Sequence, residues 1–410
     1  MSEQTPAQTP LQTLARPNPP LALEEAQRRL MALAPVLPTE HRTTADCLGV
    51  YLAEPLTALR TQPAADVSAM DGYALRAADL PGPWRVIGES AAGRPFAGTV
   101  GPGEAARIST GALVPAGADM VLIQEDAARS GDVLTLTGTP PEPPHRHIRR
   151  AGLDFRNGDV LMQPGTKVGA AQIALALTAG HAHLPVRRPL ELAVIDSGDE
   201  LAGACANLAA HQLPASNSAM LAALASQPAL RITRIGPVPD RLEALMAAFE
   251  AASDADVIVT SGGASVGDHD LIRPALAALG ADLAFWRVAI KPGKPLLVAR
   301  RGAQVILGLP GNPAAAFVTG FLFLLPLIRA ALGAADPLPR RIPARLREAM
   351  PAGGSRMEFL RAVWDAGEVS LDGLQDSGAL SSLARANALA VRPANEPETP
   401  AGQFVPVYLL

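Results

Sequence analysis

The middle of the chain reads Val257-Ile258-Val259-Thr260-Ser261-Gly262-Gly263-Ala264-Ser265-Val266-Gly267. The β-branched run predicts a strand, and the glycines after it predict a tight turn. A helical pattern follows from Leu271 to Leu279. A strand that ends in glycines and leads into a helix is how α/β proteins build anion sites, because free backbone N–H groups at the helix start face the ligand. The stretch therefore predicts an α/β domain with an anion-binding site.

Two further motifs follow this stretch closely. The first is the turn Ile290-Lys291-Pro292-Gly293-Lys294-Pro295, which holds two cations in a frame that prolines make rigid. The second is a strand, Gln304 to Leu307, that ends in Gly308-Leu309-Pro310-Gly311-Asn312-Pro313. Either glycine turn alone is typical of a simple chain reversal. Together with the lysines they favour a phosphate-bearing ligand.

Strands alternate with helices from Leu190 onward, which predicts a parallel sheet whose ligand lies at the carboxyl ends of the strands. Acidic residues follow three successive strands: Glu200, Asp240 and Asp270. Carboxylates beside a phosphate site bind hard cations, so we expect Mg²⁺ here. The alternative is helix capping, which aspartate at a helix start often performs.

The composition limits the class of protein. A chain of 410 residues is too long for one core, and its net charge of −4 gives no footprint for nucleic acid. Its two cysteines, Cys47 and Cys205, lack metal-ligand spacing, so we expect neither structural zinc nor disulfides, and a cytoplasmic location. The apolar run 314–332 is long enough to cross a membrane, but polar residues and a proline interrupt it. We expect a buried helix and no membrane partner.

The patterning predicts a multidomain α/β protein. A β pattern interrupts two N-terminal stretches that each look too small to fold alone, and after Pro337 the chain reads as short strands without helices. The expected division is a disordered tail (1–20), a mixed α/β domain (21–60 with 149–188), a β-rich inserted domain (61–148), a central parallel-sheet α/β domain (189–335) and a C-terminal β-barrel-like domain (336–410).

Several separated motifs resemble those of the molybdopterin molybdenumtransferase family (MoeA/gephyrin). The resemblance runs from about Leu23 to the C-terminus, with the motifs in the family's order, so coincidence is implausible. The matching motifs are Asp66–Ala74, Gly88–Gly93, Thr110–Pro115, Ile148–Gly152, Thr260–Gly267, Ile290–Pro295 and Gly308–Pro313.

The resemblance implies an enzyme that inserts molybdate into adenylylated molybdopterin with Mg²⁺ and releases AMP. It implies a molybdopterin-binding-like central domain, a homodimer, and contacts with other cofactor-biosynthesis proteins and molybdoenzyme chaperones. Carried over motif by motif, it assigns catalysis to Asp66, Thr110, Asp154, Lys291 and Lys294, and metal binding to Glu200, Asp240 and Asp270. It assigns substrate binding to Ser261, Gly262, Gly263, Ser265, Gly267, Pro295, Gly308, Pro310, Gly311, Asn312, Arg356 and Ser381.

The chain departs from the family pattern at four positions. Ala215 and Leu153 stand where acids are usual, and Asp240 stands alone where two aspartates are usual. Ala315 replaces a serine that is thought to help hold molybdate, so we expect weaker molybdate binding.

Two other functions remain alternatives. An adenylyltransferase acting one step earlier shares the central type of domain, but the additional domains at both ends argue against it. A non-catalytic scaffold would not need the acidic and basic residues. A P-loop is excluded, because GxxxxGK[ST] does not occur in the chain.

Overall fold

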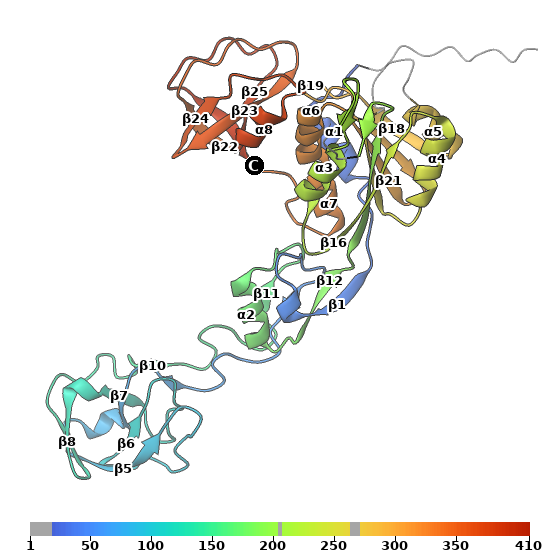
Figure 1. Ribbon diagram of the computed structural model, residues 1–410. Coiled ribbons are helices and arrows are strands. Elements are labelled where there is room, and N and C mark those ends of the chain that lie inside the picture. The colour runs from blue at the N-terminus through green and yellow to red at the C-terminus, as the bar shows by residue number, and fades with distance from the viewer. Residues whose placement is uncertain (1–18, 204–206, 263–270) are drawn as a thin grey trace, which may run out of the picture. The chain divides into compact units, whose positions relative to one another are not determined.

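The computed structural model describes residues 19–203, 207–262 and 271–410. The chain divides into two compact units, shown in sequence colours in Figure 1. Unit 1 comprises the described residues of 1–40, 49–51 and 187–410, and unit 2 comprises 41–48 and 52–186.

A six-stranded sheet forms the centre of unit 1. Its strands are β13 (Leu190–Ser197), β16 (Leu230–Val238), β17 (Val257–Ser261), β18 (Asp282–Trp286), β20 (Leu297–Arg301) and β21 (Gln304–Leu309). Their order is β16-β13-β17-β21-β20-β18. The strands β16, β13, β17 and β21 are parallel, β20 runs antiparallel to β21, and the edge strand β18 runs antiparallel to β20. All residues of β17 and β21 are buried, as in parallel strands covered on both faces.

Helices cover both faces of this sheet (Figure 1). The helices are α1 (Leu23–Met31), α3 (Asn217–Ala225), α4 (Leu242–Ala251), α5 (Ile272–Ala278), α6 (Pro313–Thr319) and α7 (Leu325–Ala331). One face carries α4 and α5, and the other carries α3, α6 and α7, with α1 packed on α7. Two very short strands, β14 (Leu201–Ala202) and β15 (Leu213–Pro214), pair outside the sheet.

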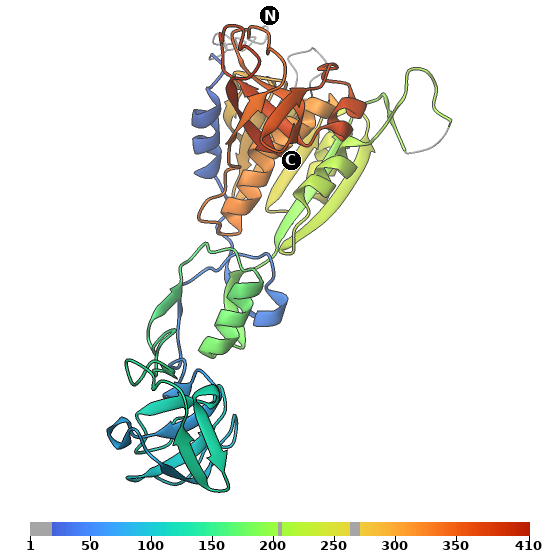
Figure 2. The same ribbon diagram turned by 90° about the vertical axis from the view of Figure 1, so that its left-hand side faces the viewer.

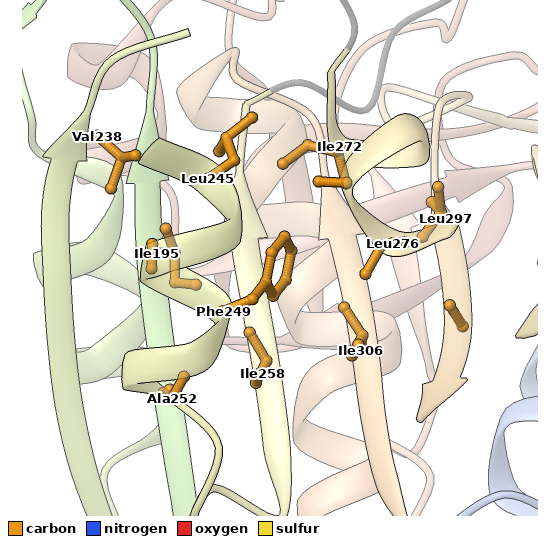
Figure 3. Packing of buried hydrophobic residues seen from close by; sticks show 14 residues of the cluster. Ile195, Val238, Leu245, Phe249, Ala252, Ile258, Ile272, Leu276, Leu297 and Ile306 are labelled. Carbon is orange, nitrogen blue, oxygen red and sulfur yellow. The ribbon is translucent and has the colours of Figure 1, made fainter. Parts of the chain in front are cut away.

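A single apolar core lies between the sheet and the α4–α5 layer (Figure 3). Phe249 of α4 is fully buried at its centre, with Ile258 of β17 below it and Ile272 and Leu276 of α5 beside it. Because this core packs against β17, it fixes the position of the carboxyl end of that strand.

The apolar run forms one continuous helix, with a π-helical segment η4 (Gly320–Leu324) between α6 and α7 (Figure 2). It has the length and apolarity of a membrane span, but 83% of its most apolar window is buried inside the protein. The expectation of a buried helix is confirmed.

Helix α1 belongs to unit 1. The Gln27 side chain of this helix is buried, and its Nε2 donates a hydrogen bond to the Leu322 carbonyl at 2.9 Å. The expected division grouped residues 21–60 with 149–188. In the structure, the described residues up to Glu40 belong to unit 1, whereas 52–186 belong to unit 2. The two-unit division does not resolve the five expected segments, and their boundaries stay a prediction.

The C-terminal part of unit 1 is a closed barrel. Its strands are β22 (Ile342–Leu346), β23 (Met357–Asp365), β24 (Glu368–Leu371), β25 (Ala388–Arg392) and β26 (Phe404–Leu409), and β23 pairs with β25 to close it. The expected barrel-like module is thereby confirmed. A short strand, β19 (Ile290–Lys291), pairs in parallel with the first residues of β23. The expectation that helices stop after Pro337 was wrong, because α8 (Leu380–Arg385) covers the barrel with Ser382 and Leu383 buried.

Unit 2 contains a six-stranded, mostly antiparallel sheet of order β7-β4-β6-β5-β9-β8. These strands are β4 (Gly72–Leu75), β5 (Trp84–Ser90), β6 (Glu104–Ile108), β7 (Met120–Ile123), β8 (Ala127–Ser130) and β9 (Val133–Leu136). The remaining elements are β1 (Thr39–Thr43), β2 (Leu56–Thr57), β3 (Val67–Ser68), β10 (Ile148–Arg149), β11 (Val160–Met162), α2 (Ala170–Ala179) and β12 (His183–Arg187), with 3₁₀ turns at Thr44–Asp46, Ala77–Asp79 and Gln124–Asp126.

Candidate active site

The loops after the parallel strands surround a cavity of about 570 Å³, here called the small cavity. Its wall includes Asp196 and Ser197 at the end of β13, Gly262 after β17 and Gly311 after β21. Carboxyl ends of neighbouring parallel strands meet at one sheet edge, which is where ligands bind in such folds.

Asn217 joins two of these loops at the start of α3. Its Nδ2 donates to Ser261 Oγ at 2.8 Å and to the Gly311 carbonyl at 2.7 Å. Asp196, which is 2% exposed, accepts the Ser218 N–H with both carboxylate oxygens. A carboxylate at a helix N-terminus is stabilised by the helix dipole. The strand-end loops are therefore cross-linked around the cavity.

Gly262 is required by its surroundings. Its φ is +104°, and a Cβ there would lie 2.3 Å from the Ser197 carbonyl oxygen. Any other residue would force β13 and β17 apart at the cavity edge. The sequence-predicted Gly263, Ser265 and Gly267 lie outside the described residues.

Two of the three predicted metal ligands line the small cavity. Glu200 is exposed there, and Asp240 Oδ1 accepts a hydrogen bond from Ser197 Oγ at 2.8 Å. The third, Asp270, lies outside the described residues. Within residues 19–203, 207–262 and 271–410, no three acidic, histidine or cysteine side chains gather to hold a metal ion. The donors present are hard oxygens, which suit Mg²⁺ chemically.

A second cavity of about 810 Å³, here called the large cavity, shares Pro295, Pro310 and Asn312 with the small one. The lysine turn forms part of its wall, and barrel residues form the rest. Ala315 of α6 also contributes to the wall and is 4% exposed.

The two predicted lysines differ in their partners. Lys291 Nζ lies 3.0 Å from Glu358 Oε1 on β23. Among the described residues, Lys294 makes no ion pair, and its ammonium is exposed at the cavity. Arg356 lines the same cavity, and its Nη1 donates to the Ile290 carbonyl at 3.2 Å. Three cations thus converge on one wall, an arrangement that suits a multiply charged oxyanion.

A barrel loop brings a serine that the sequence did not indicate. Ser377 lines the large cavity; its Oγ accepts from Asn312 Nδ2 at 2.9 Å, and its carbonyl accepts the Ala314 N–H at 3.0 Å. The loop is held by Arg361, which is 1% exposed and donates to the Leu374 and Asp376 carbonyls. Burial lowers the pKa of the Arg361 guanidinium, which remains charged because an arginine cannot be deprotonated in proteins.

Three predicted substrate-binding residues lie elsewhere, and one of them, Ser261, is buried at the end of β17. Ser381 is exposed on α8, and Gly308 lies inside β21, paired with Thr260 and Leu297. None of the three belongs to the described lining of the two cavities. No local sequence pattern distinguishes Ser377, because serine is a common residue in polar turns.

The remaining predicted catalytic residues, Asp66, Thr110 and Asp154, belong to unit 2. Asp66 accepts the Ala151 N–H at 2.9 Å and pairs with Arg150. The Ala151 bond, with the Arg150 pair adding to it, holds the pKa of the Asp66 carboxyl below its usual range.

Thr110 is anchored in a similar way. Its N–H and hydroxyl both donate to Asp71 Oδ1, at 2.6 and 3.0 Å. These bonds hold the pKa of the Asp71 carboxyl below its usual range. Asp154 is exposed.

Comparison with known proteins covers nearly the whole chain. Residues 21–180 match the family described as "MoeA N-terminal region (domain I and II)", residues 193–330 match "Probable molybdopterin binding domain", and residues 343–410 match "MoeA C-terminal region (domain IV)".

Several relatives of similar sequence are named molybdopterin molybdenumtransferase. The molybdopterin molybdenumtransferase of Nostoc sp. is 35% identical over 88% of this chain and 86% of its own length. Its Bacillus subtilis namesake is 33% identical over 95% and 94%. The crystal structure of a molybdopterin biosynthesis MoeA protein from Pyrococcus horikoshii superposes with a TM-score of 0.82 at 28% identity, over 95% of this chain and 99% of that one. This chain belongs to the MoeA family of molybdopterin molybdenumtransferases.

Proposed function

We propose that this chain inserts molybdate into adenylylated molybdopterin and releases AMP. The observation that carries the proposal is the wall of the large cavity, where Lys291, Lys294 and Arg356 converge beside the strand-end loops of the α/β sheet. A tetrahedral dianion needs cationic donors held in a rigid frame, and the proline-rich turn supplies that frame.

The neighbouring small cavity suits the phosphate linkage of the substrate. The Gly262 and Gly311 turns allow close approach of a phosphate to the backbone, and Asn217 holds the two loops together. Glu200 and Asp240, with Asp270, would hold Mg²⁺. When bound, Mg²⁺ would neutralise phosphate charge and polarise the phosphorus–oxygen bonds.

The proposal assigns further roles that rest on the family motifs. Asp66, Thr110 and Asp154 are proposed as catalytic residues on the strength of those motifs. Ser377 is a further candidate for substrate binding besides Ser381, since it lines the large cavity together with Ala315. The adenylyltransferase alternative is not favoured, because the chain also matches both terminal MoeA regions.

The test is to incubate the purified chain with adenylylated molybdopterin, Mg²⁺ and molybdate, and to measure AMP and mature cofactor by chromatography. We expect both products, and neither without molybdate and Mg²⁺. Formation of adenylylated molybdopterin from ATP and molybdopterin, without cofactor, would instead identify the earlier enzyme.

Lys294→Ala tests the oxyanion site. Because it removes a cation that makes no ion pair among the described residues, we expect the molybdate concentration for half-maximal insertion to rise by about tenfold or more. Lys167→Ala is the matched control, since Lys167 is an exposed lysine in unit 2. An unchanged molybdate requirement in Lys294→Ala would remove the lysine turn from the site.

A further inference from the structure

Three charged side chains form a row across neighbouring strands at the wall of the large cavity. Lys291 of β19 is in register with Glu358 of β23, and Glu358 is in register with Arg392 of β25. Glu358 therefore lies between two cations. Its Oε1 is 3.0 Å from Lys291 Nζ, and its Oε2 accepts a hydrogen bond from Arg392 Nη2.

The members of this row differ in exposure. The side chains of Glu358 and Arg392 are 4% and 10% exposed, whereas that of Lys291 is 56% exposed. Arg392 is also held by the Pro351 carbonyl, which accepts from its Nη1. A carboxylate this deeply buried needs a fixed cationic partner, and the buried Arg392 provides one.

The balance of charge follows from this arrangement. Lys291 and Glu358 alone would cancel, so this pair would add little to the attraction that Lys294 and Arg356 exert on an anion in the cavity. With Arg392 the row carries one net positive charge, and its solvent-facing member is Lys291. Charge that is not cancelled locally attracts an anion in proportion to its magnitude.

We infer that Arg392 is a positioning residue that neutralises Glu358 and so leaves the charge of Lys291 available to the bound oxyanion. Arg392 also lines the large cavity, but its side chain is nine-tenths buried and bonded to Glu358, so it acts on the oxyanion through Glu358 and Lys291. The inference rests on the proposed function and adds a determinant of oxyanion affinity outside the lysine turn.

The test measures molybdate binding to the full chain by calorimetry, without other substrates. Arg392→Met keeps the volume but leaves Glu358 to cancel Lys291, so the Kd for molybdate should rise about fivefold, the effect of removing one unit charge near a dianion in a water-filled cavity. Adding Glu358→Gln to Arg392→Met should bring the Kd back to within about twofold of the wild type, because the row again carries one net positive charge.

If Arg392→Met does not fold, Glu358→Gln alone still tests the inference through its Kd for molybdate. It leaves two uncancelled cations, so the Kd should fall below that of the wild type. Arg347→Met is the matched control, because Arg347 pairs with Asp365 and Glu368 on the barrel and does not line the large cavity.

Two results would overturn the inference. One is an unchanged Kd in Arg392→Met together with a lower melting temperature, which would make Arg392 a structural residue of the barrel. The other is a raised Kd in Glu358→Gln, which would mean that Glu358 serves to hold Lys291 in place. Lys294→Ala distinguishes the two possible failures. If the Kd of Lys294→Ala for molybdate equals that of the wild type, the proposed oxyanion site is wrong. If its Kd rises, only the role proposed for Arg392 is wrong.

Discussion

Ala315 lies in α6 with its methyl group at the wall of the large cavity. It offers no side-chain hydrogen bond, and the serine that lines the same cavity, Ser377, already accepts a hydrogen bond from Asn312. The serine hydroxyl that the family resemblance leads us to expect at position 315 is thus absent. A serine side chain at this position would face the large cavity.

Ala315→Ser should tighten molybdate binding. One added hydrogen bond to a charged group contributes on the order of 1.5 kcal/mol, so the molybdate concentration for half-maximal insertion should fall by about tenfold. Ala352→Ser, at an exposed position of the same cavity, is the control. A serine at 315 that leaves the requirement unchanged would show that its hydroxyl bonds back to the helix.

Asp66 offers a pH-dependent measurement in unit 2. Its folded pKa is below its usual value, so the ionised carboxylate stabilises the unit at pH above the unfolded pKa, and that contribution is lost as the pH falls through the folded pKa. Arg150→Met should raise the pKa of Asp66 only part of the way, because the Ala151 N–H bond remains. An NMR titration of the Asp66 carboxyl carbon measures this, and a complete return to the ordinary value would contradict it.

At the scale of elements, α4 matters because it covers the strands that lead into the site. Phe249 is fully buried between α4, β17 and α5, whereas Phe404 at the barrel edge is 63% exposed. The turns that we propose to bind the substrate therefore depend on a core that lies on one face of the sheet.

Phe249→Ala should destabilise this layer by about 3–5 kcal/mol, the usual cost of removing a buried aromatic ring. Hydrogen exchange of the α4 and β17 amides is the appropriate measurement, because a chain with two compact units need not unfold in one step. Phe404→Ala should leave those amides unchanged. Equal loss of protection in both variants would mean that the two residues stabilise one common structure.

At the scale of the whole molecule, two exposed leucines form a small cluster near the end of α2 in unit 2. Leu59 and Leu177 are 59% and 46% exposed, and Leu59 is tied to the end of α2 through the Ala179 carbonyl. Clusters of this kind are typical of surfaces that a partner covers. A second copy of the chain is the partner that the family resemblance suggests.

We expect a homodimer in sedimentation equilibrium at micromolar concentration. Charges at the cluster, introduced as Leu59→Glu with Leu177→Glu, should shift the chain toward monomer, whereas Val133→Glu on β9 should not. A wild-type chain that sediments as a monomer would contradict the expectation.

Local sequence patterns determined much of the fold. The β-branched run before Gly262, the alternating strands and helices and the short C-terminal strands each specify an element through propensities that act within a few residues. The same patterns located the lysine turn and the strand-end acids. They failed where local signals conflict with packing: α8 forms because Ser382 and Leu383 are buried against the barrel.

Tertiary structure alone decided which of these residues meet. The pairing of β19, β23 and β25 aligns Lys291, Glu358 and Arg392, although more than a hundred residues separate the first from the last. A loop contact with Asn312 brings Ser377, and not Ser381, to the wall that includes Ala315. Register and loop packing depend on contacts between distant segments, so no window of the sequence contains them.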